Sequence, residues 1–387
     1  MKNVLRRIKK KDNKTQNKKK ANNTIKNNQI KNNIIEEQEK NEINKMLKAK
    51  YDYKINYIFK KTPNFKYKSD IVNWNEYYGI NDIFEVYTTY KQNKLYLCSA
   101  FNRLRIYELD PFQLILVLYG HDYERIASVR YFINKNNNNE YLISSDKSGL
   151  VVIYDITNNY KIKYRINAGF GANIYSCLLV FPELNKYKDN YIVAITDTYD
   201  SASLAKFYSF NSGELIREMN TGSVNGDYLL SWYNKKLDKY YVIMMLRYKI
   251  IITNLIEDEL YADLKQEREK GHYSGFIYSN DNSEYVCSTS VEGYITVWDL
   301  YSKNIIKIIY LNGAYLHHII QWNEKYIIVA ADKSIKIINF ENNKVVSELK
   351  GHDMDGIICI KKIFHPIYGE SLLSACHSQK IKLWITA

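Results

Sequence analysis

A short strand-like motif recurs seven times in this chain, and its spacing is the strongest constraint on the fold. Its clearest copy runs from Ile295 to Leu300 and contains the adjacent pair Trp298 and Asp299. The positions equivalent to Trp298 are 107, 154, 208, 253, 298, 338 and 384, so neighbouring copies lie 40 to 54 residues apart. Repeats of this length indicate one supersecondary unit used seven times, each unit being too small to bury its apolar surface alone.

The residues around these motifs have the periodicity of β-strands. From about residue 51 onward, short runs of β-branched and aromatic residues alternate with polar ones and are separated by turns rich in Asn, Asp, Gly and Lys. The hydrophobic content of 46% is sufficient for a sizeable core. We therefore predict an all-β domain over residues 51–387.

Other landmarks occur in phase with the Trp-equivalent positions. A Gly-His pair opens three repeats, at Gly120-His121, Gly271-His272 and Gly351-His352. The segment Gly271–Leu300 resembles one WD40 repeat, because it opens on Gly-His and closes on Trp-Asp. This resemblance extends from about residue 80 to the last residue, and it implies a seven-bladed β-propeller that serves as a binding platform.

The resemblance also implies a hydrogen-bonded network of His, Ser or Thr, Asp and Trp within each blade. The chain keeps this set only in part: Glu292 stands at the Asp position of the fifth repeat, and Ser148 and Tyr154 replace Asp and Trp in the second. We expect Ser288 to be the hydrogen-bond partner of Trp298. The residues assigned to the network are His121, Ser144, His272, Ser288, Glu292, Trp298, His352, Ser374 and Trp384.

The N-terminal segment differs from the rest in composition. Residues 1–50 contain 16 Lys and Arg against 5 Asp and Glu, which accounts for +11 of the net charge of +13. Asn and Lys dominate this segment, and so few large apolar side chains cannot offset the entropy of ordering. We predict a mostly disordered basic tail, with a short amphipathic helix at about residues 34–49.

The seventh repeat lacks a fourth strand of its own, because the chain ends three residues after Trp384. A bare sheet edge at that position would be unfavourable. We expect a segment before Ile83 to supply the missing strand and close the ring. Lys54–Lys60 is the preferred candidate, because apolar and polar residues alternate there, and Asn64–Val72 is the alternative.

No motif for catalysis or cofactor binding is recognisable. The five Cys show no Cys-x-x-Cys spacing, and the chain has no phosphate-binding Gly loop, no His-Glu-x-x-His and no Gly-x-Ser-x-Gly. The adjacent His317 and His318 would point to opposite faces of a strand, so they cannot share a metal ion. We expect a non-enzymatic protein without metal or cofactor. The absence of a long apolar run and of paired Cys favours an intracellular location, cytoplasmic or nuclear.

The predicted topology places the turns between second and third strands on one face of the ring. Aromatic residues and Arg in these turns are the types that contribute most to protein interfaces. We predict a scaffold or adaptor that binds a protein or peptide segment there, within a multiprotein complex. The alternative is binding of nucleic acid or an anionic surface through the basic tail, with the propeller as carrier. The candidate contact residues are Phe101, Arg103, Lys147, Tyr199, Arg247, Tyr248, Lys333 and His377.

Overall fold

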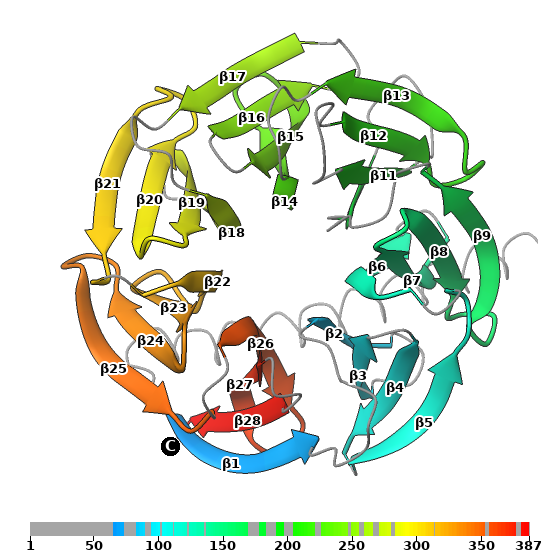
Figure 1. Ribbon diagram of the computed structural model, residues 1–387, viewed down its shortest axis with the longest axis horizontal. Coiled ribbons are helices and arrows are strands. Elements are labelled where there is room, and N and C mark those ends of the chain that lie inside the picture. The colour runs from blue at the N-terminus through cyan, green and yellow to red at the C-terminus, as the bar shows by residue number, and fades with distance from the viewer. Residues whose placement is uncertain are drawn as a thin grey trace, which may run out of the picture. The chain divides into compact units, whose positions relative to one another are not determined.

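The described part of the chain consists of β-strands and connecting turns, without any helix (Figure 1). The structure is a computed structural model, and it contains 28 strands. It describes residues 65–72, 83–89, 94–100, 103–110, 112–121, 124–134, 137–168, 178–182, 191–196, 204–220, 226–246, 249–254, 259–265, 271–279, 283–312, 314–352, 356–376 and 381–386. The predicted tail and helix at residues 1–50 lie outside these ranges.

The strands form seven antiparallel sheets of four strands each, named blades 1 to 7 in chain order. Blades 1 and 2 comprise β2 (Ile83–Thr88), β3 (Leu95–Ala100), β4 (Leu104–Leu109), β5 (Phe112–Leu118), β6 (Ile126–Asn134), β7 (Asn139–Asp146), β8 (Leu150–Asp155) and β9 (Lys161–Asn167). Blades 3 and 4 comprise β10 (Leu178–Pro182), β11 (Tyr191–Thr196), β12 (Leu204–Ser209), β13 (Leu215–Asn220), β14 (Gly226–Asn234), β15 (Lys239–Leu246), β16 (Lys249–Asn254) and β17 (Glu259–Lys265). Blades 5, 6 and 7 comprise β18 (His272–Ser279), β19 (Glu284–Ser290), β20 (Tyr294–Asp299), β21 (Ile305–Tyr310), β22 (Leu316–Gln321), β23 (Tyr326–Ala331), β24 (Ser334–Asn339), β25 (Lys344–Lys350), β26 (Ile357–His365), β27 (Gly369–Cys376), β28 (Ile381–Thr386) and β1 (Phe65–Val72).

The blades are arranged around a central axis, and this confirms the predicted seven-bladed propeller (Figure 1). The first strand of each blade is innermost and the fourth is outermost. All seven Trp-equivalent positions lie on third strands, and their side chains are at most 5% exposed. The spacing of the motif therefore predicted the number of blades correctly. No helix that could cross a membrane occurs in the described part of the chain.

Blade 7 is completed by a strand from the other end of the chain. β1 pairs antiparallel with β28, from Phe65 opposite Thr386 to Val72 opposite Ile381, and Figure 1 shows the two strands side by side. The outer position is thus taken by the alternative segment, and the preference for Lys54–Lys60, which lies outside the described residues, was wrong. Strand alternation alone did not discriminate the two segments. A strand ending at Val72 leaves a shorter connection to β2 than one ending at Lys60. Bringing the ends of a shorter connection together costs less conformational entropy.

The second and third strands of the blades hold most of the core. All six residues of β23 are buried, whereas most residues of the outermost strand β25 are exposed. Inner strands are covered on both faces by neighbouring blades, and such strands consist of nearly continuous apolar runs. One core cluster joins blades 6 and 7 through residues such as Trp322, Ile337 and Trp384. The strand ends, and the turns between them, are therefore held in place by a packed core.

Candidate binding face

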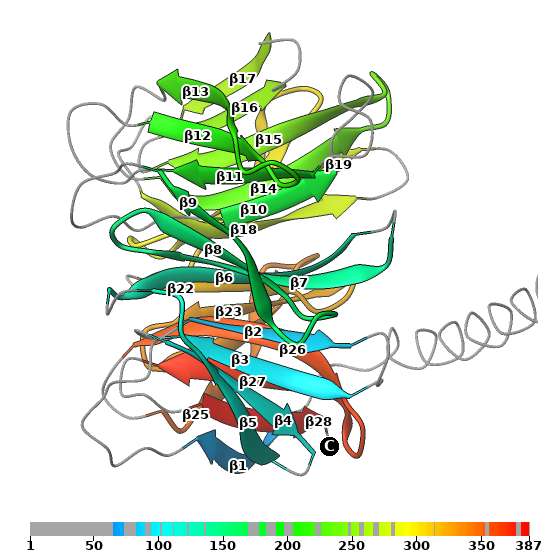
Figure 2. The same ribbon diagram turned by 90° about the vertical axis from the view of Figure 1, so that its right-hand side faces the viewer.

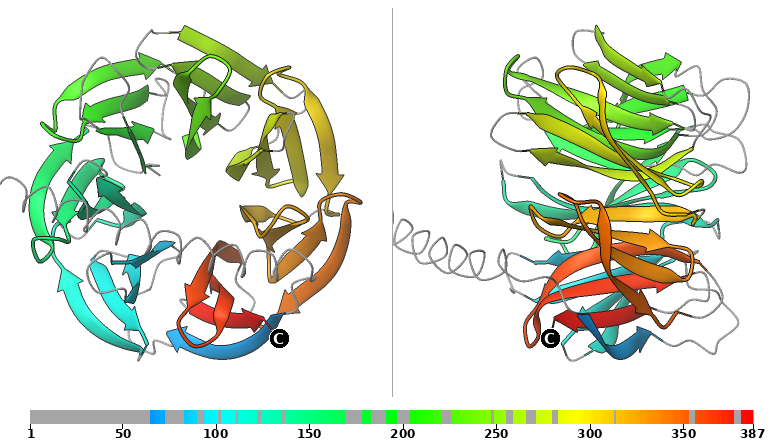
Figure 3. Two further views of the ribbon diagram at one scale, coloured as in Figure 1. Left: turned by 180° about the vertical axis from the view of Figure 1, so that it is seen from behind. Right: turned by 90° about the vertical axis from the view of Figure 1, so that its left-hand side faces the viewer.

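The connections between strands lie at two faces of the ring (Figures 2 and 3). Because successive strands are antiparallel, the turns between second and third strands lie on the same face as the connections into each first strand. We call this the loop face. Its described segments include residues 103, 119–121, 147–149, 271–273, 291–293, 314–315, 332–333 and 351–352.

Three of the predicted contact residues lie in described turns of the loop face. Arg103 and Lys147 are partly exposed in blades 1 and 2, and Lys333 is exposed in blade 6. They come from turns of different blades, so they do not form one cluster by themselves. The other candidates lie outside the described residues: Phe101, Tyr199, Arg247, Tyr248 and His377.

Arg103 is paired with an aromatic residue that the sequence analysis did not consider. Its guanidinium carbon lies 4.5 Å from the centre of the Tyr119 ring, and Nη1 is 3.5 Å from the Tyr119 hydroxyl. Tyr119 is 63% exposed, on the connection from β5 to β6. A cation stacked on an aromatic ring restrains both side chains without burying them. The pair therefore presents a preformed amphipathic surface.

Two further tyrosines are exposed where the chain enters a first strand. Tyr273 and Tyr315 are 40% and 55% exposed. The backbone of Tyr315 is fixed by Asp332, whose amide donates to the Tyr315 carbonyl (3.0 Å) and whose Oδ2 accepts from the Tyr315 amide (3.2 Å). The contact residues predicted from the sequence all lie in turns between second and third strands. The same topological argument assigns these connections to the loop face. The available signal was a Tyr at the start of a first strand, next to Gly271-His272 in the case of Tyr273.

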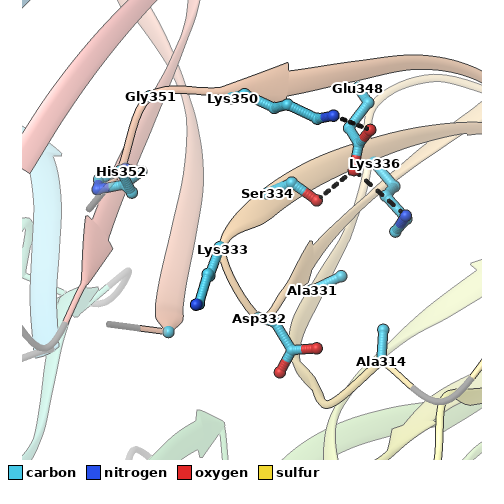
Figure 4. A pocket seen from close by; sticks show the side chains of 11 residues that line it. Ala314, Ala331, Asp332, Lys333, Ser334, Lys336, Glu348, Lys350, Gly351 and His352 are labelled. Atoms are coloured by element: carbon cyan, nitrogen blue, oxygen red, sulfur yellow. Dashed lines mark hydrogen bonds and ion pairs between the residues drawn. The ribbon is translucent and has the colours of Figure 1, made fainter. Parts of the chain in front are cut away.

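A pocket of about 510 Å³ lies where blade 6 meets the connection into blade 7 (Figure 4). Glu348 lies on its wall, accepting a hydrogen bond from Ser334 (2.6 Å) and pairing with Lys336 (3.4 Å) and Lys350 (3.3 Å). The Ser334 hydrogen bond and the two ammonium groups lower the pKa of Glu348, so it stays ionised. The pocket is lined by Ala314, Ala331, Asp332, Lys333, Ser334, Lys336, Glu348, Lys350, Gly351, His352 and Gly356.

The blade network in blade 2 contains a carboxylate that the sequence analysis missed. His121 Nδ1 lies 2.7 Å from Asp146 Oδ2, and His121 Nε2 lies 2.7 Å from Ser144 Oγ. Burial would raise the pKa of Asp146, but hydrogen bonds from His121 and Ser148 outweigh burial, and the pKa is lowered. Asp146 stands two residues before the position where the repeat pattern has Asp. Ser148 at that position instead donates its hydroxyl to Asp146 Oδ1 (2.6 Å).

Blades 7 and 5 differ in their networks although both keep the Trp. In blade 7 the Trp384 indole N–H donates to Ser374 Oγ (2.7 Å), and His352 Nε2 lies 2.6 Å from the same oxygen. In blade 5, Trp298 Nε1 has no hydrogen-bond partner among the described residues. The expected Trp298–Ser288 bond is therefore wrong, because the Ser288 hydroxyl instead faces the Thr296 carbonyl at 3.5 Å.

A buried carboxylate joins blades 4 and 5 in a way that the repeat pattern does not predict. Glu284 is 7% exposed and accepts hydrogen bonds from the Trp232 indole and the Tyr301 hydroxyl, both at 2.8 Å. Trp232 belongs to the first strand of blade 4, and Glu284 begins the second strand of blade 5. A carboxylate that accepts hydrogen bonds from two donors, one of them the buried Trp232 indole, is a strong polar contact. It stabilises the blade interface at the face opposite the loop face.

Folding stability should depend on pH through His272. This residue is 1% exposed, and burial lowers its pKa to about 4. The unfolded chain therefore takes up a proton near pH 6.5 that the folded chain refuses until about pH 4, so stability falls as the pH drops through this window. We expect a loss of roughly 2 kcal/mol between pH 7 and pH 5 through this residue. Urea unfolding at both pH values, compared with His272→Gln, measures it, and an equal pH dependence in the variant would contradict it.

The described residues offer little that could carry catalysis or hold a metal. No group of three His, Cys, Asp or Glu side chains in the described part could hold a metal ion. His317 and His318 contact different rings, Tyr273 at 6.4 Å and Tyr228 at 6.1 Å between centroids. Burial raises the pKa of the Cys98 and Cys287 thiols, which therefore remain protonated and poorly nucleophilic.

Comparisons with known proteins leave the family of the chain open. No protein-family model matches it, and no curated protein has a similar sequence. The seven-bladed architecture is consistent with the WD40 type. The chain is a seven-bladed β-propeller, a fold that is commonly a protein-interaction scaffold.

Proposed function

We propose that this protein is a non-enzymatic scaffold or adaptor whose loop face binds a segment of a protein partner. The Arg103–Tyr119 pair is the observation that carries the proposal, because it places an exposed aromatic ring and a cation together at rigid strand ends. Tyr and Arg supply most of the binding energy at protein interfaces, where a large apolar surface with a polar end binds at little entropic cost.

Two other features of the loop face support the same function. Tyr273 and Tyr315 add exposed aromatic surface in blades 5 and 6. The pocket lined by Lys333 can receive a polar side chain of the bound segment. Contacts distributed over several blades suit an extended segment or a folded surface, and they suit membership in a multiprotein complex.

The basic N-terminal segment supports a second function. Residues 1–50 carry a net charge of +11, which suits binding of nucleic acid or an anionic surface, with the propeller as carrier. Salt separates the two functions, since contacts with phosphate weaken steeply with salt concentration whereas an aromatic protein contact does not. If binding survives removal of residues 1–50 and changes little with salt concentration, the result supports binding of the partner by the loop face.

The loop face is tested by the double variant Arg103→Ala and Tyr119→Ala. We expect it to lower affinity for the natural partner by about 2 kcal/mol or more, which is roughly 30-fold. The measurement is quantitative mass spectrometry of proteins retained by the immobilised full chain, followed by titration of the retained partner. Melting temperature should stay unchanged, because both side chains lie at the surface.

A matched control is available on the opposite face. Ile367 is 63% exposed, the same fraction as Tyr119, in the turn between β26 and β27. Ile367→Ala should leave the retained proteins unchanged. Loss of the partner in the Ile367 variant, with retention in the double variant, would assign binding to the opposite face instead.

A further inference from the structure

The outer edge of blade 5 differs from the outer edges of the other blades. β21 is the last strand of its sheet and pairs only with β20, so its second edge has no paired strand among the described residues. Its sequence is IIKIIY, with one charged residue. Four of its side chains are large, apolar and exposed: Ile305 (37%), Ile306 (53%), Ile308 (49%) and Tyr310 (53%). Native proteins normally cover such an edge or protect it with charges.

The single cation of β21 does not protect this edge. The Lys307 ammonium donates to the Phe340 carbonyl and lies 4.6 Å from the centre of the Phe340 ring, so it is turned toward blade 6. By contrast, the outermost strands β1, β9, β13, β17 and β25 each carry two or more charged residues. The outermost strand β5 has no charge either, but Val117, which has the register position of Ile308, is only partly exposed.

The backbone of β21 also faces outward at two of the exposed positions. The Leu311 amide donates to the Gly293 carbonyl of the same blade (2.8 Å), and hydrogen-bonded pairs recur at every second residue of an antiparallel ladder. The N–H and C=O groups of Ile309 therefore face β20, and those of Ile308 and Tyr310 point to the open edge. A strand held in a folded blade is already ordered, so pairing at this edge costs little backbone entropy.

We propose that β21 pairs antiparallel with β21 of a second copy of this chain, which makes the protein a two-fold symmetric dimer. A second copy fits this edge because the strand is self-complementary. With the two-fold axis at Ile308, each Ile308 lies opposite its counterpart and Ile306 lies opposite Tyr310. Lys307 then lies opposite Ile309, whereas an axis at Lys307 would set two ammonium groups against each other. A two-fold contact uses the same edge of both copies and leaves neither open.

Pairing of the two edges joins the four-stranded sheets of two blades into one continuous sheet. Ile306 and Tyr310 form a pair of a β-branched and an aromatic residue twice in the dimer, and such cross-strand pairs are favourable. The apolar side chains of both copies are removed from water at the same time. Because β21 lies at the periphery of the ring, the dimer presents two loop faces (Figure 1). Only the use of these two faces for bivalent binding rests on the proposed function.

Sedimentation velocity of the full chain over a range of concentrations tests the dimer. We expect reversible association from 45.8 kDa to twice that mass. Ile308→Lys should raise the dissociation constant about 100-fold or more, because it sets two like charges against each other in the contact. Val345→Lys is the matched control, since Val345 is a β-branched residue, 44% exposed, on the outermost strand of blade 6. A chain that stays monomeric at every concentration, or a dimer that both changes weaken equally, would overturn the proposal.

Cross-linking through Ile308→Cys tests the register of the pair. Opposite residues of a hydrogen-bonded antiparallel pair have Cα atoms about 5.5 Å apart, which a disulfide can span. With oxidised glutathione as the oxidant, this variant should form a reducible covalent dimer, whereas Val345→Cys and the unchanged chain should not. Equal cross-linking at both positions would contradict the register.

Neither measurement needs a partner protein, so this inference and the proposed function fail separately. A dimer through β21 whose loop-face variant keeps the partner would establish the dimer and reject the loop-face residues. A monomer whose loop-face variant loses the partner would do the reverse.

Discussion

Removal of residues 1–75 should destabilise the whole propeller, whereas removal of residues 1–61 should leave it folded. The longer deletion removes β1, whose six paired positions cover the edge of β28. At about 0.5 to 1 kcal/mol for each backbone hydrogen bond, the expected loss is about 3 to 6 kcal/mol. Such a loss is a large fraction of the stability of a typical domain. Urea unfolding of the two truncated chains measures it.

The shorter deletion is the matched control, because it retains β1 and the connection to β2. A synthetic peptide of residues 62–75 provides a second one. Added to the longer deletion, it should raise the melting temperature in a concentration-dependent way, since it restores the missing strand. Equal melting temperatures for the two truncated chains would show that β1 contributes nothing to closure.

Trp384→Ala should be among the most damaging single substitutions, at about 3 to 5 kcal/mol. The side chain is 2% exposed, packs in the cluster between blades 6 and 7, and donates a hydrogen bond to Ser374. Trp298→Ala should cost a similar amount from cavity formation alone. The two positions separate under the milder change to Phe, which keeps most of the apolar volume but removes the indole N–H.

A double-mutant cycle measures this difference. Trp384→Phe combined with Ser374→Ala should show a coupling free energy of about 1 kcal/mol, because the two groups share a buried hydrogen bond. Trp298→Phe combined with Ser288→Ala should show no coupling free energy beyond a packing contribution, since Trp298 Nε1 has no hydrogen-bond partner among the described residues. A larger coupling in blade 5 than in blade 7 would reverse the assignment of the networks.

Local pattern in the sequence determined the all-β class, the number of blades and the position of the motif on each third strand. These features are repeated seven times, and each depends on residues within one hairpin, where alternation and turn residues directly reflect which side chains are buried. The exposed residues of the turns were also predictable in part: Arg103 and Lys333 lie on the face that the strand order implies.

Tertiary structure alone decided the contacts between segments that are distant in the chain. β1 rather than an equally alternating neighbour closes blade 7, Asp146 rather than Ser148 supplies the carboxylate to His121, and Glu284 joins two blades through Trp232. Such contacts depend on distances set by the packing of strands and blades, and Asp146, at the end of β7 and two residues out of phase with the repeat pattern, still reaches His121.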